Sequence, residues 1–249
     1  MIELFCGTKS VSKVFLQRPE WSACSVDVEA SFEPDLVADV LDLPLDFVRG
    51  ADVLWCSPPC TAYSRAKTCG PRDLQTADSL SLHSVNLCKA CTGIWFIENP
   101  ASGMLKDRPW MQELPWADVS YCHYGFPYRK NTRIWSNLWT MTSWRPKMCK
   151  KDCLQMVGSR HRCTAQRGPS YPHDRTFTQR ELYRVPPALL EQLFIATRTV
   201  LATRALLSVE ATIAGLSPEG PSRSGPEEEE YRSSSGAPEA RLGARTDLE

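Results

Sequence analysis

Short apolar runs that alternate with helical stretches constrain the fold of this chain more than any other feature. The runs occupy residues 2–5, 21–28, 36–40, 52–56 and 94–97. Between the first two, Val11, Val14 and Phe15 recur at helical spacing. This alternation is typical of the α/β class, in which a parallel sheet carries helices on both faces. We therefore expect strand, turn and helix to repeat along the first half of the chain.

The polar residues at the ends of these runs carry the chemistry. They are Cys6 with Gly7, Asp27, Asp39, Cys60 and Glu98. Because ligands bind at the carboxyl ends of parallel strands, we expect these residues to share one site. A glycine turn lets the backbone approach a ligand, and an acidic residue ending the second strand can accept hydrogen bonds from two ribose hydroxyls. The segment ELFCGTKS lacks the phosphate-binding glycine patterns, which favours a nucleoside cofactor without phosphates.

Length and composition predict one main domain in a reducing compartment. With 249 residues and 42% hydrophobic content, the chain can bury one sizeable core. The longest apolar stretch, residues 188–207, contains Glu191, Arg198 and Arg204, so it predicts an amphipathic helix and no membrane span. The cysteine count of eleven is odd and no signal pattern opens the chain, which indicates reduced thiols. We expect an intracellular protein of the nucleus or cytoplasm.

Charge is distributed unevenly, although the formal net charge is zero. Residues 217–249 contain 8 acidic and 4 basic residues and few apolar ones, so we expect a disordered tail over 211–249. Residues 129–167 contain 10 lysines and arginines against one acidic residue, with Trp135, Trp139 and Trp144 between them. This basic window suits a nucleic acid, with tryptophans stacking on bases. The alternative interpretation is a solvated face whose tryptophans belong to the core.

The segment DVLWCSPPCTAYS, residues 52–64, places a cysteine directly after two prolines. Pro58 and Pro59 fix two φ angles and remove two backbone donors, so the chain must leave the strand extended. This would hold Cys60 rigidly over the edge of the cofactor site. Cys56, inside the apolar run, is expected to be an ordinary buried residue.

Six segments in this order resemble the motifs of the cytosine-C5 DNA methyltransferases, which use S-adenosylmethionine. The resemblance covers about the first 140 residues. The segments are ELFCGT, SVDVE, ADVLDLP, DVLWCSPPCTAYS, IENP and HYGFPYRKNTRIW. The resemblance implies a Rossmann-like methyltransferase sheet with helices on both faces. The cofactor-binding residues that it implies are Phe5, Cys6, Gly7, Thr8, Asp27, Val28, Asp39, Val40 and Pro58.

The resemblance also implies a covalent mechanism. Cys60 would add to carbon 6 of cytosine, which activates carbon 5 toward the methyl group. Glu98 would assist at the N3 edge, and Arg133 would bind the carbonyl oxygen of the base or stabilise the charged intermediate. The implied substrate-binding residues are Thr61, Ser64, Asn99, Arg129 and Lys130. The target base would have to flip out of its stack.

Two departures from the family pattern concern the cofactor site. Lys9 stands two places after Gly7, where a second glycine is usual. The last family motif, a Gly-Asn turn before a helix, is not visible, and residues 185–198 supply only the helix.

A cluster of soft ligands lies in the basic window. Cys149, Cys153, His161 and Cys163 could hold a tetrahedral structural zinc, although their spacing is not that of a common zinc finger. The alternative is a set of scattered reduced cysteines in a loop.

These patterns predict four regions, and they leave the function open between three hypotheses. The regions are a catalytic core over 1–140, a small irregular basic recognition region over 141–180, an amphipathic helix packing on the core over 181–210 and the tail over 211–249. The leading hypothesis is methylation of cytosine C5 in DNA. The second is a related methylation, either of cytosine C5 in RNA or of an amino group. The third is a nucleic-acid-binding protein of the same fold that has lost catalysis.

Overall fold

The computed structural model describes residues 1–165 and 177–213. The recognition region predicted over 141–180 is therefore described in part, and the predicted disorder of the tail falls almost entirely outside the described residues. Within the described ranges, no helix is long and apolar enough to cross a membrane.

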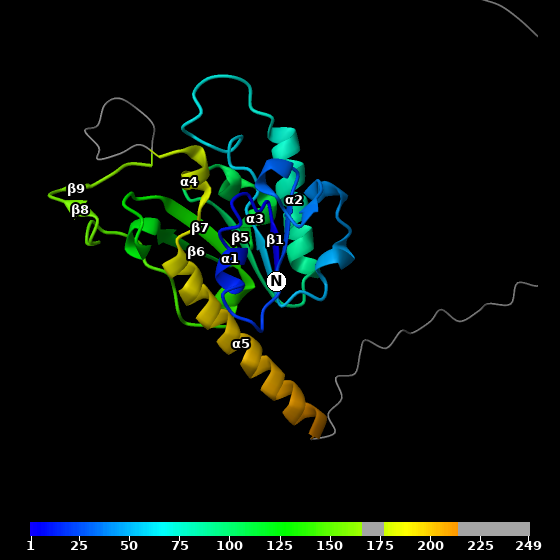
Figure 1. Cartoon of the computed structure of the whole chain (residues 1–249). Helices are drawn as coiled ribbons and strands as arrows, with labels where there is room; N and C mark the ends of the chain where they lie inside the picture. Colours follow the sequence, from blue (N-terminus) through cyan, green and yellow to red (C-terminus); the bar gives the residue numbers. More distant parts are fainter. Residues whose placement is uncertain (166–176, 214–249) are drawn as a thin grey trace, which may run out of the picture. The chain divides into compact units, whose positions relative to one another are not determined.

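A seven-stranded sheet forms the centre of the described part, in the order β3-β2-β1-β4-β5-β7-β6 (Figure 1). Its strands are β1 Ile2–Leu4, β2 Cys24–Asp27, β3 Leu36–Val37, β4 Val53–Cys56, β5 Ile94–Pro100, β6 Trp116–Ser120 and β7 Asn131–Ser136. The strands from β1 to β5 pair in parallel, as predicted. The pattern did not predict β6 and β7, which pair antiparallel with each other and with β5. The sheet is therefore mixed.

Helices cover both faces of this sheet, which confirms the predicted α/β architecture. The α-helices are α1 Ser12–Phe15, α2 Leu74–Ala90, α3 Pro109–Gln112, α4 Gln179–Tyr183 and α5 Pro187–Ile213. The 3-10 helices are η1 Ala30–Phe32, η2 Val40–Asp42, η3 Leu45–Val48, η4 Leu105–Asp107, η5 Tyr121–Tyr124 and η6 Asn137–Thr140. A small separate hairpin consists of β8 Met156–Val157 and β9 Arg160–His161.

Alternate residues of β4 and β5 supply the two halves of the core. Val53 and Trp55 face a cluster that includes residues of α1 and the first turns of α5. Leu54 and Cys56 face the other cluster, with residues of α2 and η3. Because both strands are buried on both faces, β4 is apolar throughout, and β5 is apolar from Ile94 to Ile97. Cys56 is fully buried, as expected for an ordinary core residue.

Local signals explain where the helices begin. Asp73 caps α2 by accepting a hydrogen bond from the backbone N–H of Thr76. Thr178 and Glu181 form a reciprocal capping box at α4. Pro187 opens α5, where its missing N–H costs no helical hydrogen bond. The first residues of these helices therefore determine where the loops at the carboxyl edge of the sheet end.

Candidate active site at the carboxyl edge of the sheet

A cavity of about 280 Å³ opens where β1, β2, β4 and β5 end. It contains all nine residues predicted to bind the cofactor, together with Cys60 and Glu98. Its wall also includes Glu3, Ser10, Val11, Phe32, Tyr183 and Val185, which were not among the predicted site residues. A second hollow, along α5 and Trp144, has no thiol or carboxylate among its lining residues. The chemistry predicted from the strand ends therefore converges on the first cavity.

The loop after β1 turns through three left-handed residues. Phe5, Gly7 and Lys9 have φ values of 56°, 46° and 55°. Lys9 thus adopts the backbone conformation that favours glycine at the position where a second glycine is usual. The backbone N–H of Gly7 donates to Asp27 Oδ2 over 2.9 Å, which joins this loop to the end of β2.

The charges in the cavity suit a cationic nucleoside. The carboxylates of Glu3, Asp27, Asp39 and Glu98 line it, whereas Lys130 is the one lysine or arginine among its described lining residues. Phosphates would need cationic partners, whereas ribose hydroxyls and a sulfonium are favoured by carboxylates. These hydrogen-bond acceptors and negative charges therefore fit S-adenosylmethionine. Tyr183 and Val185 precede α5 and line the cavity, and Val185 N–H donates to Ser10 Oγ over 3.2 Å, so this segment contributes to the cavity wall.

Glu3 is a buried carboxylate that the motif comparison did not single out. It accepts hydrogen bonds from the backbone of Val11 and Ser12, at 3.3 Å and 2.7 Å, and from the Ser12 hydroxyl. Burial raises the pKa of Glu3 to about 6, against the opposing effect of these hydrogen bonds. The carboxylate therefore fastens the start of the first helical turn to β1.

The double-proline loop is held by the neighbouring strand. Asn99 Nδ2 donates to the carbonyl of Pro58 over 2.8 Å, and Pro58 itself is buried. Cys60 follows, half-buried at the cavity. Burial and the Glu98 carboxylate raise the pKa of the Cys60 thiol above its usual value, and the charge of Lys130 opposes them. The thiol therefore needs a partner or a substrate to lose its proton at neutral pH.

Glu98 lies near the end of β5 with only 6% of its surface exposed. The hydroxyl of Tyr121 donates to Glu98 Oε1 over 3.0 Å, and Lys130 Nζ lies 3.6 Å from the same oxygen. Burial raises the pKa of Tyr121 well above its usual range, so the phenol remains a proton donor in this contact. No motif indicated Tyr121, which the tertiary structure alone brings to Glu98.

Arg133 does not line the cavity, in contrast to its predicted catalytic role. Its guanidinium forms two hydrogen bonds with Asp118, at 2.7 Å and 3.0 Å, and stacks 3.6 Å from the ring centre of Trp116. The reason is the antiparallel pairing, which sets Arg133 opposite Asp118 in β6. Lys130, just before β7, takes the position beside Glu98.

Some of the predicted substrate-binding residues line the cavity and others do not. Thr61, Asn99 and Lys130 line the cavity, whereas Ser64 and Arg129 are not among its lining residues. Ser64 belongs to the next turn, where its carbonyl accepts a hydrogen bond from Arg72 over 2.7 Å.

Two of the three tryptophans of the basic window are buried, and the third, Trp144, is partly buried against the core. Trp135 and Trp139 are 1% and 4% exposed, and Trp144 packs beside Trp139 with 6.0 Å between ring centres. The placement of Trp135 and Trp139 supports the alternative interpretation, in which these tryptophans belong to the core and do not stack on bases. The exposed cations of the described window are Arg129, Arg145, Lys147, Lys150, Lys151, Arg160 and Arg162.

The structure brings together three of the four predicted metal ligands, Cys149, Cys153 and His161, and their fourth partner is Cys122. Cys163 instead lies against Tyr128 and Phe177. The prediction missed Cys122 because it precedes the basic window, in η5.

Comparison with known proteins identifies the family. No family model matches the chain. A curated relative from Frog virus 3 (isolate Goorha), described as "Probable DNA (cytosine-5)-methyltransferase", is 32% identical over 219 residues, which cover 78% of this chain and 97% of the relative.

Solved methyltransferases share only a distant likeness. The Entamoeba histolytica methyltransferase EhMeth is 15% identical with a TM-score of 0.41, over 54% of this chain and 51% of its own. The S. pombe Dnmt2 methyltransferase is 12% identical with a TM-score of 0.40, over 62% and 58%. This chain thus spans a little over half the length of these solved chains. By its identity to the curated relative over nearly that protein's whole length, the chain belongs to the DNA (cytosine-5)-methyltransferase family.

Proposed function

We propose that this protein methylates carbon 5 of cytosine in DNA, with Cys60 as the nucleophile. The observation that carries the proposal is the shared cavity of Cys60 and Glu98, which come from neighbouring parallel strands. The name of the Frog virus 3 relative supports DNA as the substrate.

The cofactor would occupy the part of the cavity nearest β1 and β2. Asp27 would accept hydrogen bonds from the ribose hydroxyls, and Asp39 with Val28 and Val40 would hold the adenine. Bound there, S-adenosylmethionine supplies an electrophilic methyl group. The backbone of Phe5, Gly7 and Thr8 would shape the turn around it.

Cys60 would supply the electrons that cytosine lacks at carbon 5. After the thiol loses its proton, the sulfur forms a bond to carbon 6 and the ring becomes an enamine, nucleophilic at carbon 5. Carbon 5 would take the methyl group as the methyl–sulfur bond of the bound cofactor breaks, which leaves a neutral thioether. Loss of the carbon 5 proton to water would then restore the ring double bond, break the bond between carbon 6 and sulfur, and regenerate the Cys60 thiolate.

Glu98 would act at N3, where charge develops during sulfur attack. Tyr121 and Lys130 contact the same carboxylate oxygen and would fix its orientation. We assign to Lys130 the cationic role that the motif comparison gave to Arg133, because Arg133 is committed to Asp118. Asn99 would keep the Cys60 loop in place through Pro58.

The exposed lysines and arginines of the basic window would neutralise phosphates, so binding should weaken with salt. Such contacts would offset the cost of flipping the target base, a few kcal/mol. Since the three tryptophans are buried or packed, phosphate contacts would dominate. We propose that the described part of residues 141–180 serves this recognition role.

The test uses trapping by 5-fluorocytosine, whose fluorine cannot leave carbon 5 as a proton does. Purified protein, S-adenosylmethionine and 5-fluorocytosine-containing DNA should give a covalent adduct stable to denaturation, and Cys60→Ser should give none. Matched RNA provides the second substrate arm. An adduct on RNA alone would replace DNA as the substrate, and binding without any adduct would favour the hypothesis of a protein that has lost catalysis.

A further inference from the structure

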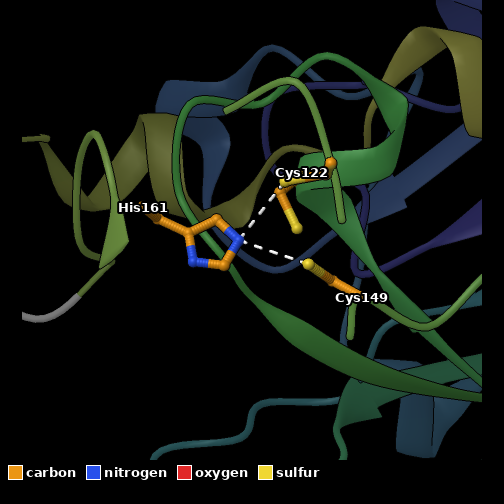
Figure 2. A group of neighbouring side chains, drawn as sticks. Cys122, Cys149 and His161 are labelled. Atoms are coloured by element: carbon orange, nitrogen blue, oxygen red, sulfur yellow. Dashed lines mark hydrogen bonds between the residues drawn. The ribbon is translucent and has the colours of Figure 1, made fainter. Parts of the chain in front are cut away.

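Four soft ligands converge outside the catalytic cavity. Cys122 lies in η5, Cys149 and Cys153 flank a short turn, and His161 ends β9. Their ligand atoms all lie within 4.8 Å of one another. Figure 2 shows the His161 ring facing the sulfur atoms of Cys122 and Cys149. Segments far apart in the sequence therefore meet at this point.

Two sulfur–nitrogen distances match those of a tetrahedral zinc site. His161 Nε2 lies 3.4 Å from the sulfur atoms of both Cys149 and Cys153. Zinc bonds of about 2.3 Å to sulfur and about 2.0–2.1 Å to nitrogen imply about 3.5 Å between sulfur and nitrogen in a tetrahedron. All three cysteines are buried and free, so none is committed to a disulfide.

The turn between Cys149 and Cys153 supports sulfur as a ligand. The backbone N–H of Lys151 donates to Cys149 Sγ over 3.3 Å, and Lys151 has φ 69°. An N–H donor aimed at a sulfur stabilises a thiolate. Lysine in a left-handed conformation is strained, so the fold retains this turn at some cost.

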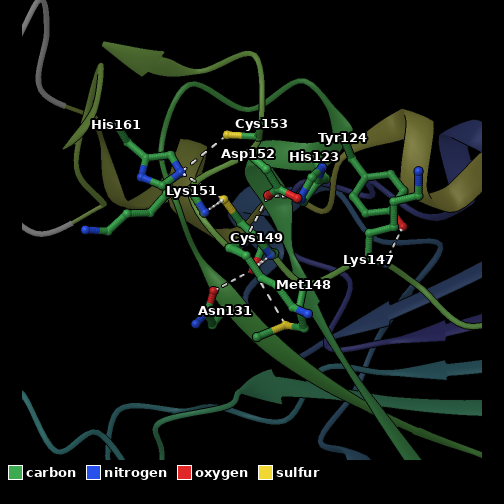
Figure 3. A network of polar contacts seen from close by, with 12 residues as sticks. His123, Tyr124, Asn131, Lys147, Met148, Cys149, Lys151, Asp152, Cys153 and His161 are labelled. Atoms are coloured by element: carbon green, nitrogen blue, oxygen red, sulfur yellow. Dashed lines mark hydrogen bonds and ion pairs between the residues drawn. The ribbon is translucent and has the colours of Figure 1, made fainter. Parts of the chain in front are cut away.

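A network of contacts fastens the turn to the end of β6 (Figure 3). Cys149 N–H donates to Ser120 Oγ over 3.0 Å, and His123 Nε2 lies 3.2 Å from Asp152 Oδ1. Asp152 also accepts from the N–H of Lys150 over 2.9 Å. Contacts from the end of β6 and from η5 therefore hold the turn that carries Cys149 in place.

The hairpin itself buries few apolar side chains. β8 and β9 are two residues each, and Leu154 and Val157 are 97% and 60% exposed. Met156 is the one partly buried apolar side chain packed against the cysteines in the described residues. A two-stranded hairpin without a hydrophobic face is not stable alone, so a metal would supply what the core does not.

We propose that Cys122, Cys149, Cys153 and His161 bind one structural zinc ion, which fixes the β8–β9 hairpin to the methyltransferase sheet. Four protein ligands leave no open coordination position, which distinguishes a structural from a catalytic zinc. The ion would present Lys150, Lys151, Arg160 and Arg162 on a rigid support. The proposal does not depend on the proposed function.

The test measures zinc in the full-length chain, purified without chelators or metal-affinity resin. Elemental analysis should find about one zinc per chain. Titration with a mercurial reagent, which forms mercury–sulfur bonds and so displaces zinc, should release the ion as three protected cysteines react. Cobalt substituted for zinc should show thiolate charge-transfer bands and the visible bands of tetrahedral cobalt.

Two matched cysteine variants discriminate the ligand set. Cys122→Ser should reduce bound zinc to below about a tenth of an ion per chain, whereas Cys163→Ser should retain it. Circular dichroism of both variants checks the fold. Retention by Cys122→Ser with loss by Cys163→Ser would overturn this set of four. The metal site would be overturned if the purified wild-type protein contained no zinc and bound none when zinc was added. A disulfide among these cysteines, found by mass spectrometry, would also overturn it.

Discussion

The two cysteine sites of this protein differ in what surrounds the sulfur. Cys60 is a single thiol beside a carboxylate, at the open end of a parallel sheet. Cys122, Cys149 and Cys153 surround one imidazole, and irregular segments bring them together. The first arrangement leaves a thiol free to attack a ligand, and the second saturates four positions around one point. The neighbours of a cysteine, more than its burial, therefore decide its chemistry.

The two sites share one backbone device. Lys9 in the loop after β1 and Lys151 in the turn after Cys149 both have positive φ. Each turn aims backbone N–H groups inward, either toward the Asp27 carboxylate through Gly7 or toward the Cys149 sulfur. Both sites therefore depend on strained turns.

The largest expected effect separates the two sites completely. Cys60→Ser should reduce methyl transfer by about a thousandfold or more, because the hydroxyl is a far weaker nucleophile toward carbon 6. Zinc content and thermal unfolding should match those of the wild type. Methyl transfer is measured with labelled cofactor on DNA; a variant with near-normal activity would remove Cys60 from the mechanism.

Removal of the metal should have the next largest effect, on stability. Cys149→Ser should lower the unfolding free energy by about 4 kcal/mol, the contribution of a ligand at a thousand times its dissociation constant, or about 8–16 °C in Tm. Calorimetry measures this change, with Cys163→Ser as the control. Limited trypsin digestion should cut the variant first within residues 147–162, because the hairpin loses its support. Equal cleavage of both variants there would contradict the comparison.

The rate of Cys60 alkylation should depend on pH and should change several-fold when the neighbouring charges are removed. Since the pKa of Cys60 is raised, its reaction with iodoacetamide should increase with pH up to and beyond pH 9. Glu98→Gln removes a negative charge and should accelerate the reaction at pH 8 by about three- to tenfold. Lys130→Met should slow it. Peptide mapping by mass spectrometry follows Cys60 itself; identical rates in all three proteins would exclude electrostatic coupling at this site.

The smallest effects concern the two left-handed lysines. Lys9→Gly and Lys151→Gly should each change stability by at most about 1 kcal/mol, with relief of strain offset by the entropy of glycine in the unfolded chain. Denaturant unfolding measures both, with Lys13→Gly in α1 as a helical control that should be destabilised. A loss of several kcal/mol in either variant would mean that the lysine side chain itself holds the turn.

Prediction from sequence succeeded where information is local. The ends of β1, β2, β4 and β5 are adjacent in a parallel sheet whatever the loops do, so Gly7, Asp27, Cys60 and Glu98 fall into one cavity. The double proline and the acidic residues at the strand ends could be identified without knowledge of distant contacts. Their catalytic and binding roles remain predictions.

The prediction was less accurate where strand register and the face on which a side chain lies determine its contacts. Arg133 and Lys130 are three residues apart, and both fit a basic motif, but only the pairing with β6 commits Arg133 to Asp118. Side chains alternate between faces along a strand, so one step of register exchanges inside and outside. Trp135, the tryptophan of the basic window that lies in β7, was ambiguous for the same reason.

The sequence by itself determined the α/β architecture, the family and the convergence of strand-end residues on one cavity, because apolar periodicity and motif order survive without tertiary contacts. Only the tertiary structure decided that Tyr121 and Lys130 accompany Glu98 and that Cys122 replaces Cys163 beside His161. Each of these contacts joins segments that are far apart in the sequence, and their spacing matches no motif. Packing, register and the direction of each side chain bring them together.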